Sequence, residues 1–180
     1  MKNEYVKAAG KLYAARLLFV IVTFIFLIPL AFLAKIWDGV LYSVLTAIPY
    51  LGLIYYDMRD KGAQDFKEVD GLSFNPKKGF FIGLLGAAGS LVLLVLLVLS
   101  AFGAFGVSFD TMRTVYHVYY GPIMNFFGGQ VETVTLLHVL APAAEILLCG
   151  VSYLIGARQA QKLRVDNKKK MDDMAEKKNA

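Results

Sequence analysis

The sequence predicts an all-α integral membrane protein with four transmembrane helices, both termini in the cytoplasm, and an interfacial helix in the outer loop between spans three and four. Three observations lead to this fold class. Hydrophobic residues make up 57% of the chain and charged residues 18%, against about 45–50% and 25% in soluble domains. The charged residues lie in blocks separated by long apolar runs, and most of the basic ones fall on one side of those runs.

Four apolar segments are long enough to cross a bilayer, whose hydrocarbon core needs roughly 20 helical residues. They span about residues 17–34, 39–56, 79–103 and 133–157. Each run is continuously apolar rather than alternating, which favours helices over membrane β-strands. The first run is also longer than the roughly 7–15 apolar residues of a signal peptide, so we interpret it as a retained span.

The basic residues predict the orientation of these spans. Of 19 Lys and Arg residues, 4 lie in the N-terminal arm 1–16, 5 in the loop 58–78 and 8 in the tail 158–180, which totals 17. Only Lys35 and Arg113 lie on the opposite side. Basic flanks stay in the cytoplasm, so both termini are predicted there. The net charge of +5 therefore reflects membrane topology, and we expect no nucleic-acid partner.

The segments outside the spans are too short and polar to form a soluble domain. Within the outer loop, residues 114–127 are too apolar for a solvated linker and too short to cross a membrane. We predict an interfacial helix that ends near Gly121 and Pro122, and a re-entrant segment is the alternative. The basic tail 158–180 is expected to continue the fourth span for a turn or two and then to be partly disordered.

The fourth span contains the candidate functional residues. Glu145 lies at its midpoint, where a carboxylate is costly. On the same helical face lie His138, seven residues earlier, and Cys149, four residues later. Pro142 lacks an amide hydrogen and clashes with the carbonyl four residues back, which is that of His138. These groups form a hypothetical polar notch for a proton, a cation or a polar head group.

The role of Glu145 has three alternative interpretations. It is protonated and hydrogen-bonds to another helix, with candidate partners Thr23, Tyr42, Thr46 and Ser90. It pairs with a cationic group on a partner protein. In the third interpretation it carries ions or protons across the membrane.

The third span carries a stripe of small residues. Gly79, Gly83 and Ala87 recur at four-residue spacing, and Gly86 and Ser90 form a second stripe. Small residues at this spacing allow two helix backbones to approach closely in a membrane. We predict a helix-packing face here, with its partner helix undetermined.

Catalytic and metal-binding motifs are missing from the sequence. It has no GxxxxGK[ST], GxSxG, HExxH or CxxC pattern, and Cys149 is its one cysteine. The acids Asp60, Asp65, Glu68 and Asp70 alternate with lysines and are interpreted as a solvated surface. We therefore expect no cofactor, no metal site and no enzyme activity, although an enzyme acting on a lipid head group through Glu145 and His138 remains the third alternative.

Two functional hypotheses follow. The first is a non-enzymatic accessory, assembly or regulatory subunit of a membrane complex. The second is a homo-oligomeric transporter or channel linked to protons or cations through the Glu145–His138 notch. The expected surroundings are the lipid bilayer, a protein partner or further copies of the chain, and anionic lipids at the basic tail. The expected location is the plasma membrane of a prokaryotic cell.

Overall fold

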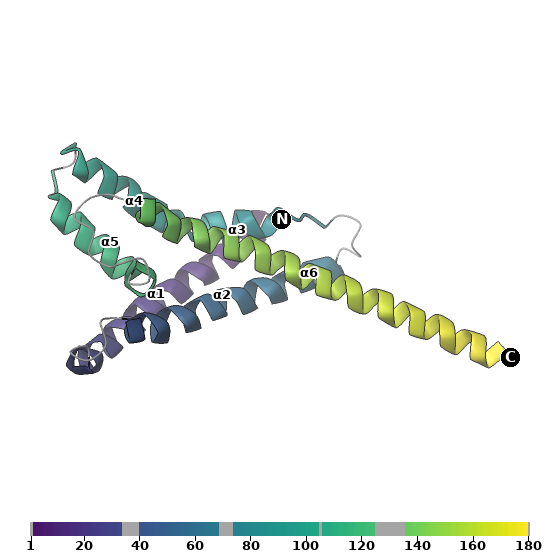
Figure 1. Cartoon of the computed structure of the whole chain (residues 1–180). Coiled ribbons are helices and arrows are strands. Elements are labelled where there is room, and N and C mark those ends of the chain that lie inside the picture. Colours follow the sequence, from purple (N-terminus) through teal and green to yellow (C-terminus); the bar gives the residue numbers. More distant parts are fainter. Residues whose placement is uncertain (1, 34–39, 69–73, 105, 125–135, 180) are drawn as a thin grey trace.

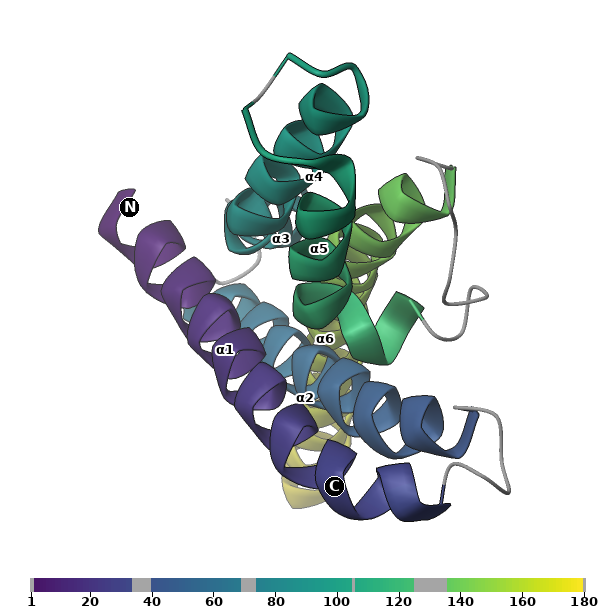
Figure 2. The same ribbon diagram turned by 90° about the vertical axis from the view of Figure 1, so that its left-hand side faces the viewer.

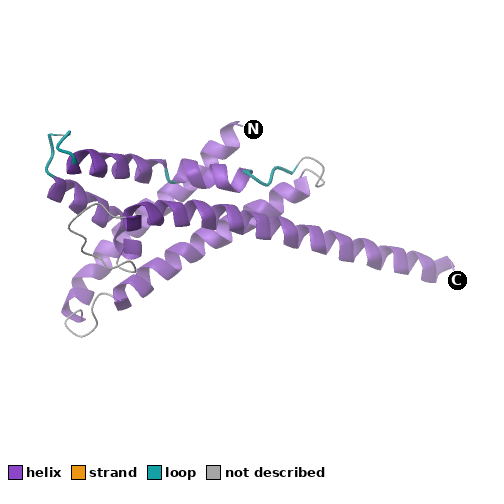
Figure 3. Ribbon diagram, turned by 45° about the horizontal axis from the view of Figure 1, so that its top comes forward, coloured by secondary structure: helices purple, strands orange, loops and turns teal. Residues whose placement is uncertain are grey.

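The computed structural model describes residues 2–33, 40–68, 74–104, 106–124 and 136–179, and contains only helices and loops in these ranges (Figure 3). Side chains 26–46 and the segments 34–39 and 125–135 lie outside the description, and with them the predicted first turn and the start of the fourth span. The helices, labelled in Figure 1, are α1 (Lys2–Leu33), α2 (Val40–Glu68), α3 (Lys78–Gly86), α4 (Ala88–Ala101), α5 (Phe109–Met124) and α6 (Leu136–Asn179).

Helices α1 and α2 are longer than the apolar runs that predicted them. The expected N-terminal arm forms the first half of α1, and α2 continues to Glu68 through most of the expected loop. Both extensions are rich in Ala, Lys, Glu and Arg, which have high helix propensity. The two helices lie side by side (Figure 2). As a result, residues expected in solvated flanks take part in the packing.

The predicted third span is bent rather than straight. Helices α3 and α4 meet at an angle of 53°. Backbone hydrogen bonding continues across the bend, since Ala87 N donates to Gly83 O (2.8 Å) and Leu91 N donates to Ala87 O (2.9 Å). The bend lies within the small-residue run 86–90, where sharp kinks are common because few side chains resist them.

Helix α6 packs most extensively on α2 and α3. Its approach to α2 is close enough to require glycine on both sides. A Cβ on Gly62 would lie 2.0 Å from the carbonyl oxygen of Tyr153, and one on Gly156 would lie 1.8 Å from that of Arg59. Glycine contacts of this kind bring helix backbones together in membrane proteins.

The small residues of the predicted packing face contact two different helices. Gly79 and Gly83 face α6, where added Cβ atoms would lie 2.5 Å from Tyr153 Cβ and 2.8 Å from Cys149 Cβ. Gly86 instead faces Leu12 of α1 at 3.2 Å. Ala87 and Ser90 are also buried.

Helix α5 runs back alongside α4 into the bundle and contacts α1, α2 and α6 as well (Figure 1). Tyr116 and Tyr120 on this helix are fully buried. It continues to Met124, slightly beyond the predicted end at Gly121 and Pro122. The segment therefore adds side chains to the centre of the bundle.

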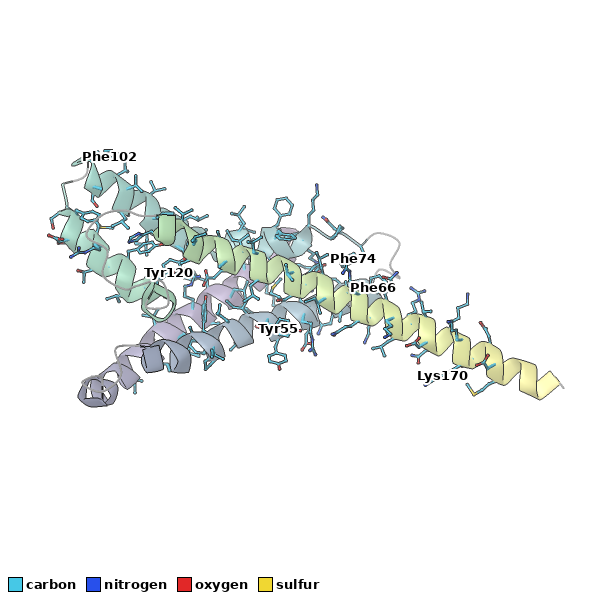
Figure 4. The ribbon with its side chains drawn as sticks, viewed as in Figure 1. Tyr55, Phe66, Phe74, Phe102, Tyr120 and Lys170 are labelled. Atoms are coloured by element: carbon cyan, nitrogen blue, oxygen red, sulfur yellow. The ribbon has the colours of Figure 1, made fainter. Side chains whose placement is uncertain are left out.

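The last part of α6 projects beyond the other helices (Figures 1 and 4). It remains helical to Asn179, whereas we expected one or two turns followed by disorder. Residues 161–174 are all exposed. Phe102 and Lys170 mark opposite ends of the molecule, with an apolar tip on α4 and a basic extension on α6 (Figure 4).

Among the described residues, α6 is the one helix that is by itself long and apolar enough to cross a membrane, and α3 with α4 gives a second if the bent pair is one span. This is fewer than the four predicted spans. Much of the first two predicted spans falls on side chains 26–46, outside the described part. The structure thus supports an all-helical chain with one or two candidate spans.

Candidate functional site

A buried ion pair between Arg16 and Glu145 lies at the centre of the bundle. Arg16 is at the middle of α1 and Glu145 is on α6, and their Nη2 and Oε2 atoms form the pair. The two residues are only 5% and 3% exposed. A buried charge is strongly unfavourable unless it is paired and hydrogen-bonded. Loss of one residue alone would therefore leave the charge of the other buried without a partner.

Tyr50 of α2 joins the two charges. Its hydroxyl donates to Glu145 Oε1 at 2.6 Å and accepts from Arg16 Nε at 3.0 Å. Arg16 Nη1 also donates to Ser90 Oγ on α4, just beyond the bend. Charge-assisted hydrogen bonds of this kind are roughly twice as strong as neutral ones. Four helices thus converge on one guanidinium.

Helix α5 encloses the pair with tyrosine rings. The guanidinium carbon of Arg16 lies 5.1 Å from the ring centre of Tyr119 and 5.0 Å from that of Tyr120. Cations within about 6 Å of a ring face are attracted to it, more strongly when desolvated. Beside the pair is a cavity of about 20 Å³, room for roughly one water molecule. It is lined by Arg16, Phe19, Val20, Tyr50, Tyr119, Tyr120 and Glu145.

The carbonyl predicted to be freed by Pro142 has a partner on α5. Pro142 lies inside α6 and cannot donate to His138 O. The Tyr116 hydroxyl donates to that oxygen instead. The His138 ring is buried against Tyr116, with centroids 5.4 Å apart. The proline thus creates an acceptor that attaches α6 to α5.

The four residues of the predicted notch do not contact one common partner. Glu145 binds Arg16 and Tyr50, whereas His138 contacts Tyr116 and Cys149 packs against Gly83. Of the predicted hydrogen-bond partners of Glu145, Ser90 belongs to the same cluster but binds Arg16. The side chains of the other candidates, Thr23, Tyr42 and Thr46, lie outside the described part.

A second polar cluster surrounds Asp65 of α2. Its carboxylate accepts from Lys61 Nζ at 2.9 Å, Lys78 Nζ at 2.7 Å and the Tyr153 hydroxyl at 2.8 Å. Lys78 lies 3.4 Å from Glu4 as well. Asp65 is only 4% exposed, so its interpretation as part of a solvated surface was wrong. The cluster connects α1, α2, α3 and α6.

The partners of Asp65 determine its ionisation. Burial alone would raise the pKa of this carboxyl, but hydrogen bonds from Lys78, Lys61 and Tyr153 outweigh burial and hold its pKa below the ordinary value. Burial likewise opposes the charge of Lys78, and the hydrogen bond and negative charge of Asp65 raise its pKa nonetheless. Both groups are therefore charged at neutral pH.

Metal chemistry finds no support in the described part of the chain, where no group of three or more His, Cys, Asp or Glu side chains is placed to hold an ion. Cys149 is buried and free. The polar groups of the central site bind one another across helices instead. Their arrangement can stabilise the bundle and can hold a proton.

Sequence reasoning missed Arg16, Tyr50 and the two tyrosines of α5. Arg16 adjoins the first apolar run and was counted among the cytoplasmic flanking charges. The available signal was that a lone carboxylate within a span requires a cation, and Arg16 is one of four basic residues that directly adjoin a predicted span, with Lys35, Lys78 and Arg158. Tyr119 and Tyr120 lie in the aromatic stretch whose apolar character had already marked it as unusual.

Comparison of the chain with protein-family models, curated proteins and solved structures gives no match. The chemistry of the site is therefore argued from its own residues.

Proposed function

We propose that this chain is a multi-pass membrane protein with four transmembrane segments and cytoplasmic termini, and that it acts as a non-enzymatic accessory, assembly or regulatory subunit of a membrane complex. Its polar and apolar side chains support the membrane placement. Charged Arg16 and Glu145 are buried, while Ile25, Val92 and Leu147 are exposed on α1, α4 and α6. Monomeric soluble proteins rarely expose large apolar patches, and lipid would cover these faces.

The two ends of the molecule support the proposed orientation. The projecting part of α6 carries Arg158, Lys162, Arg164 and the run 168–170, all exposed. The opposite end carries Phe102 and other apolar groups (Figure 4). Basic segments next to spans stay on the cytoplasmic side.

The packing of α5 favours the re-entrant alternative over a helix lying flat on the outer leaflet. Tyr116 and Tyr120 are fully buried among α1, α2, α4 and α6. A flat interfacial helix would keep such rings at the membrane surface. Irregular or short helical segments enter a membrane when protein surrounds them, and the bundle supplies that protein.

One observation carries the subunit proposal: the charge of Glu145 is balanced within the chain, while residues 161–174 at the end of α6 are exposed. The carboxylate of Glu145 binds Arg16 and Tyr50 and needs no cation from a partner. The exposed positions 161–174 extend beyond the bundle and offer both basic and apolar side chains, including Leu163, Met171 and Met174. A partner protein would bind there.

Native mass spectrometry tests this proposal. The protein carries an N-terminal tag and is solubilised from its own membranes. We expect a second polypeptide at fixed stoichiometry with the full chain. The same polypeptide should be absent after truncation at Ala160, which leaves the packed part of α6 intact. Monomers or homo-oligomers alone would contradict the subunit proposal.

A transporter linked to protons is the second candidate, and the cavity beside Glu145 favours it. Glu145 and Tyr50 line this cavity, and a carboxylate that water reached through it would exchange protons. We then expect pH-dependent proton flux in proteoliposomes and its loss in Glu145→Gln, with the purified oligomer unchanged. Absence of flux in the wild type over pH 5–8 would contradict this candidate.

A further inference from the structure

A groove of about 440 Å³ opens between the first half of α1 and the second half of α2, away from the central ion pair. This volume falls within the range of small-molecule sites, about 300–1,000 Å³. Leu12 and Met58, both buried, and Ala8 supply its apolar surface. The remaining lining residues are polar or charged.

Opposite charges line the two helices that form the groove. Lys7 and Lys11, four residues apart, lie on one face of α1, and Asp57 and Asp60, three residues apart, lie on one face of α2. No ion pair within 4.0 Å joins these lysines to these aspartates in the described part of the chain. The groove therefore separates a positive side from a negative side.

The other charged residues of the groove already have partners. Lys61 binds Asp65, and Glu4 lies 3.4 Å from Lys78. Within the described residues, Asp60 forms an ion pair with Arg59 at 3.7 Å, and exposed pairs of this kind contribute little. Two cations and two anions thus remain for a ligand that carries both signs of charge.

The place of the groove along the helices fits a lipid head group. Lys11 precedes the first predicted span and Asp57 follows the second, so both belong at the cytoplasmic membrane surface. The apolar surface of Leu12 and Met58 lies between them. Basic pockets between helices at this depth bind the phosphates of lipid head groups.

We propose that this groove binds the phosphoethanolamine head group of a cytoplasmic-leaflet lipid, with its phosphate on Lys7 and Lys11 and its primary ammonium on Asp57 and Asp60. The assignment rests on the proposed membrane placement. A primary ammonium donates three hydrogen bonds, so it suits two carboxylates. A choline head group cannot donate them, and a glycerol head group has no positive charge to balance the aspartates.

The test is native mass spectrometry of the full chain released from nanodiscs that contain equal amounts of phosphatidylethanolamine, phosphatidylcholine and phosphatidylglycerol with identical acyl chains. We expect the wild type to retain phosphatidylethanolamine about tenfold over the other two lipids. The double variant Asp57→Asn/Asp60→Asn should prefer phosphatidylglycerol, because only the positive side remains. The variant Lys7→Gln/Lys11→Gln should lose retention of all three lipids.

Matched controls change the same charges on the exposed part of α6. Asp172→Asn/Asp173→Asn and Lys168→Gln/Lys169→Gln should keep the wild-type preference. Equal retention of the three lipids by inserted wild-type protein overturns the lipid site but leaves the membrane placement standing. An unchanged preference in Asp57→Asn/Asp60→Asn also overturns it. Failure of the wild type to insert into nanodiscs overturns the membrane placement together with this site.

A final experiment distinguishes binding of the lipid from binding of a soluble molecule with the same head group. Soluble O-phosphoethanolamine is added to the detergent-solubilised chain, and its thermal unfolding is followed. We expect no shift of the midpoint at concentrations where phosphatidylethanolamine raises it. An equal shift from the soluble compound would assign the groove to a free zwitterion and overturn the lipid.

Discussion

Arg16 and Glu145 form an ion pair in the middle of the bundle, and Tyr50 is hydrogen-bonded to both of them. The pair joins the first helix to the last. Removing one partner leaves the other charge buried without compensation, whereas removing both leaves no charge to compensate. This asymmetry distinguishes a structural pair from two independent polar residues.

We therefore predict strong coupling between Arg16→Met and Glu145→Leu. Each single variant should lose about 3–5 kcal/mol of unfolding free energy. The double variant should be more stable than either single one, since similar volumes fill the space without a buried charge. Reversible unfolding in mixed micelles measures all three variants. Losses that simply add would show that the two residues act independently.

The glycines at the α2–α6 crossing give a second prediction. Gly62→Ala and Gly156→Ala place a methyl group about 2 Å from backbone oxygen atoms that cannot move without separating the helices. Each should cost about 1–3 kcal/mol or more. Gly52→Ala on the same helix is the matched control, because nothing lies within 4 Å of its added Cβ. That variant should be neutral or up to about 1 kcal/mol more stable. Equal effects at Gly52 and Gly62 would contradict the close crossing.

The sequence predicted part of the fold well and part poorly, for physical reasons. The all-helical class followed from continuous apolar runs. Helix ends were missed at residues 2–16 and 58–68, because helix-forming polar residues extend α1 and α2 past their apolar runs. The bend between α3 and α4 was missed because a small-residue run predicts close packing but not whether the helix stays straight.

The sequence predicted the residues that α6 contributes to the candidate site, but not their partners on other helices. Glu145 was singled out by its cost at the centre of a span, and the freed carbonyl of His138 by the position of Pro142. Their partners, Arg16 and Tyr116, come from two other helices, α1 and α5. Pairing of this kind depends on how helices are arranged in space, which local patterns do not determine.

Tyr116 provides a third prediction through its bond to the His138 carbonyl. Tyr116→Phe should cost about 1–3 kcal/mol, because a buried acceptor loses its partner. In a Pro142→Ala background the alanine amide can donate to that carbonyl, so the same substitution should cost less. Unfolding free energies of the two single variants and the double variant measure this coupling. An equal cost of Tyr116→Phe in both backgrounds would rule out the proposed role of the freed carbonyl.

Asp65 provides the last prediction, a pH dependence of stability. Its pKa in the folded chain lies below the ordinary value of about 3.9, so the unfolded chain binds the proton more readily. The resulting stabilisation is fully present above the ordinary pKa and is lost as pH falls through the folded pKa.

We expect Asp65→Asn to lower the unfolding midpoint by a constant amount between pH 7 and 5. The gap between the midpoints of the variant and the wild type should narrow below about pH 4. Thermal unfolding in micelles across this range measures the gap, with Asp166→Asn on the exposed part of α6 as the control that should show none. A gap that stays constant down to pH 2 would mean that the lysines and Tyr153 do not stabilise the Asp65 carboxylate, and that the cluster stabilises the helix ends by packing alone.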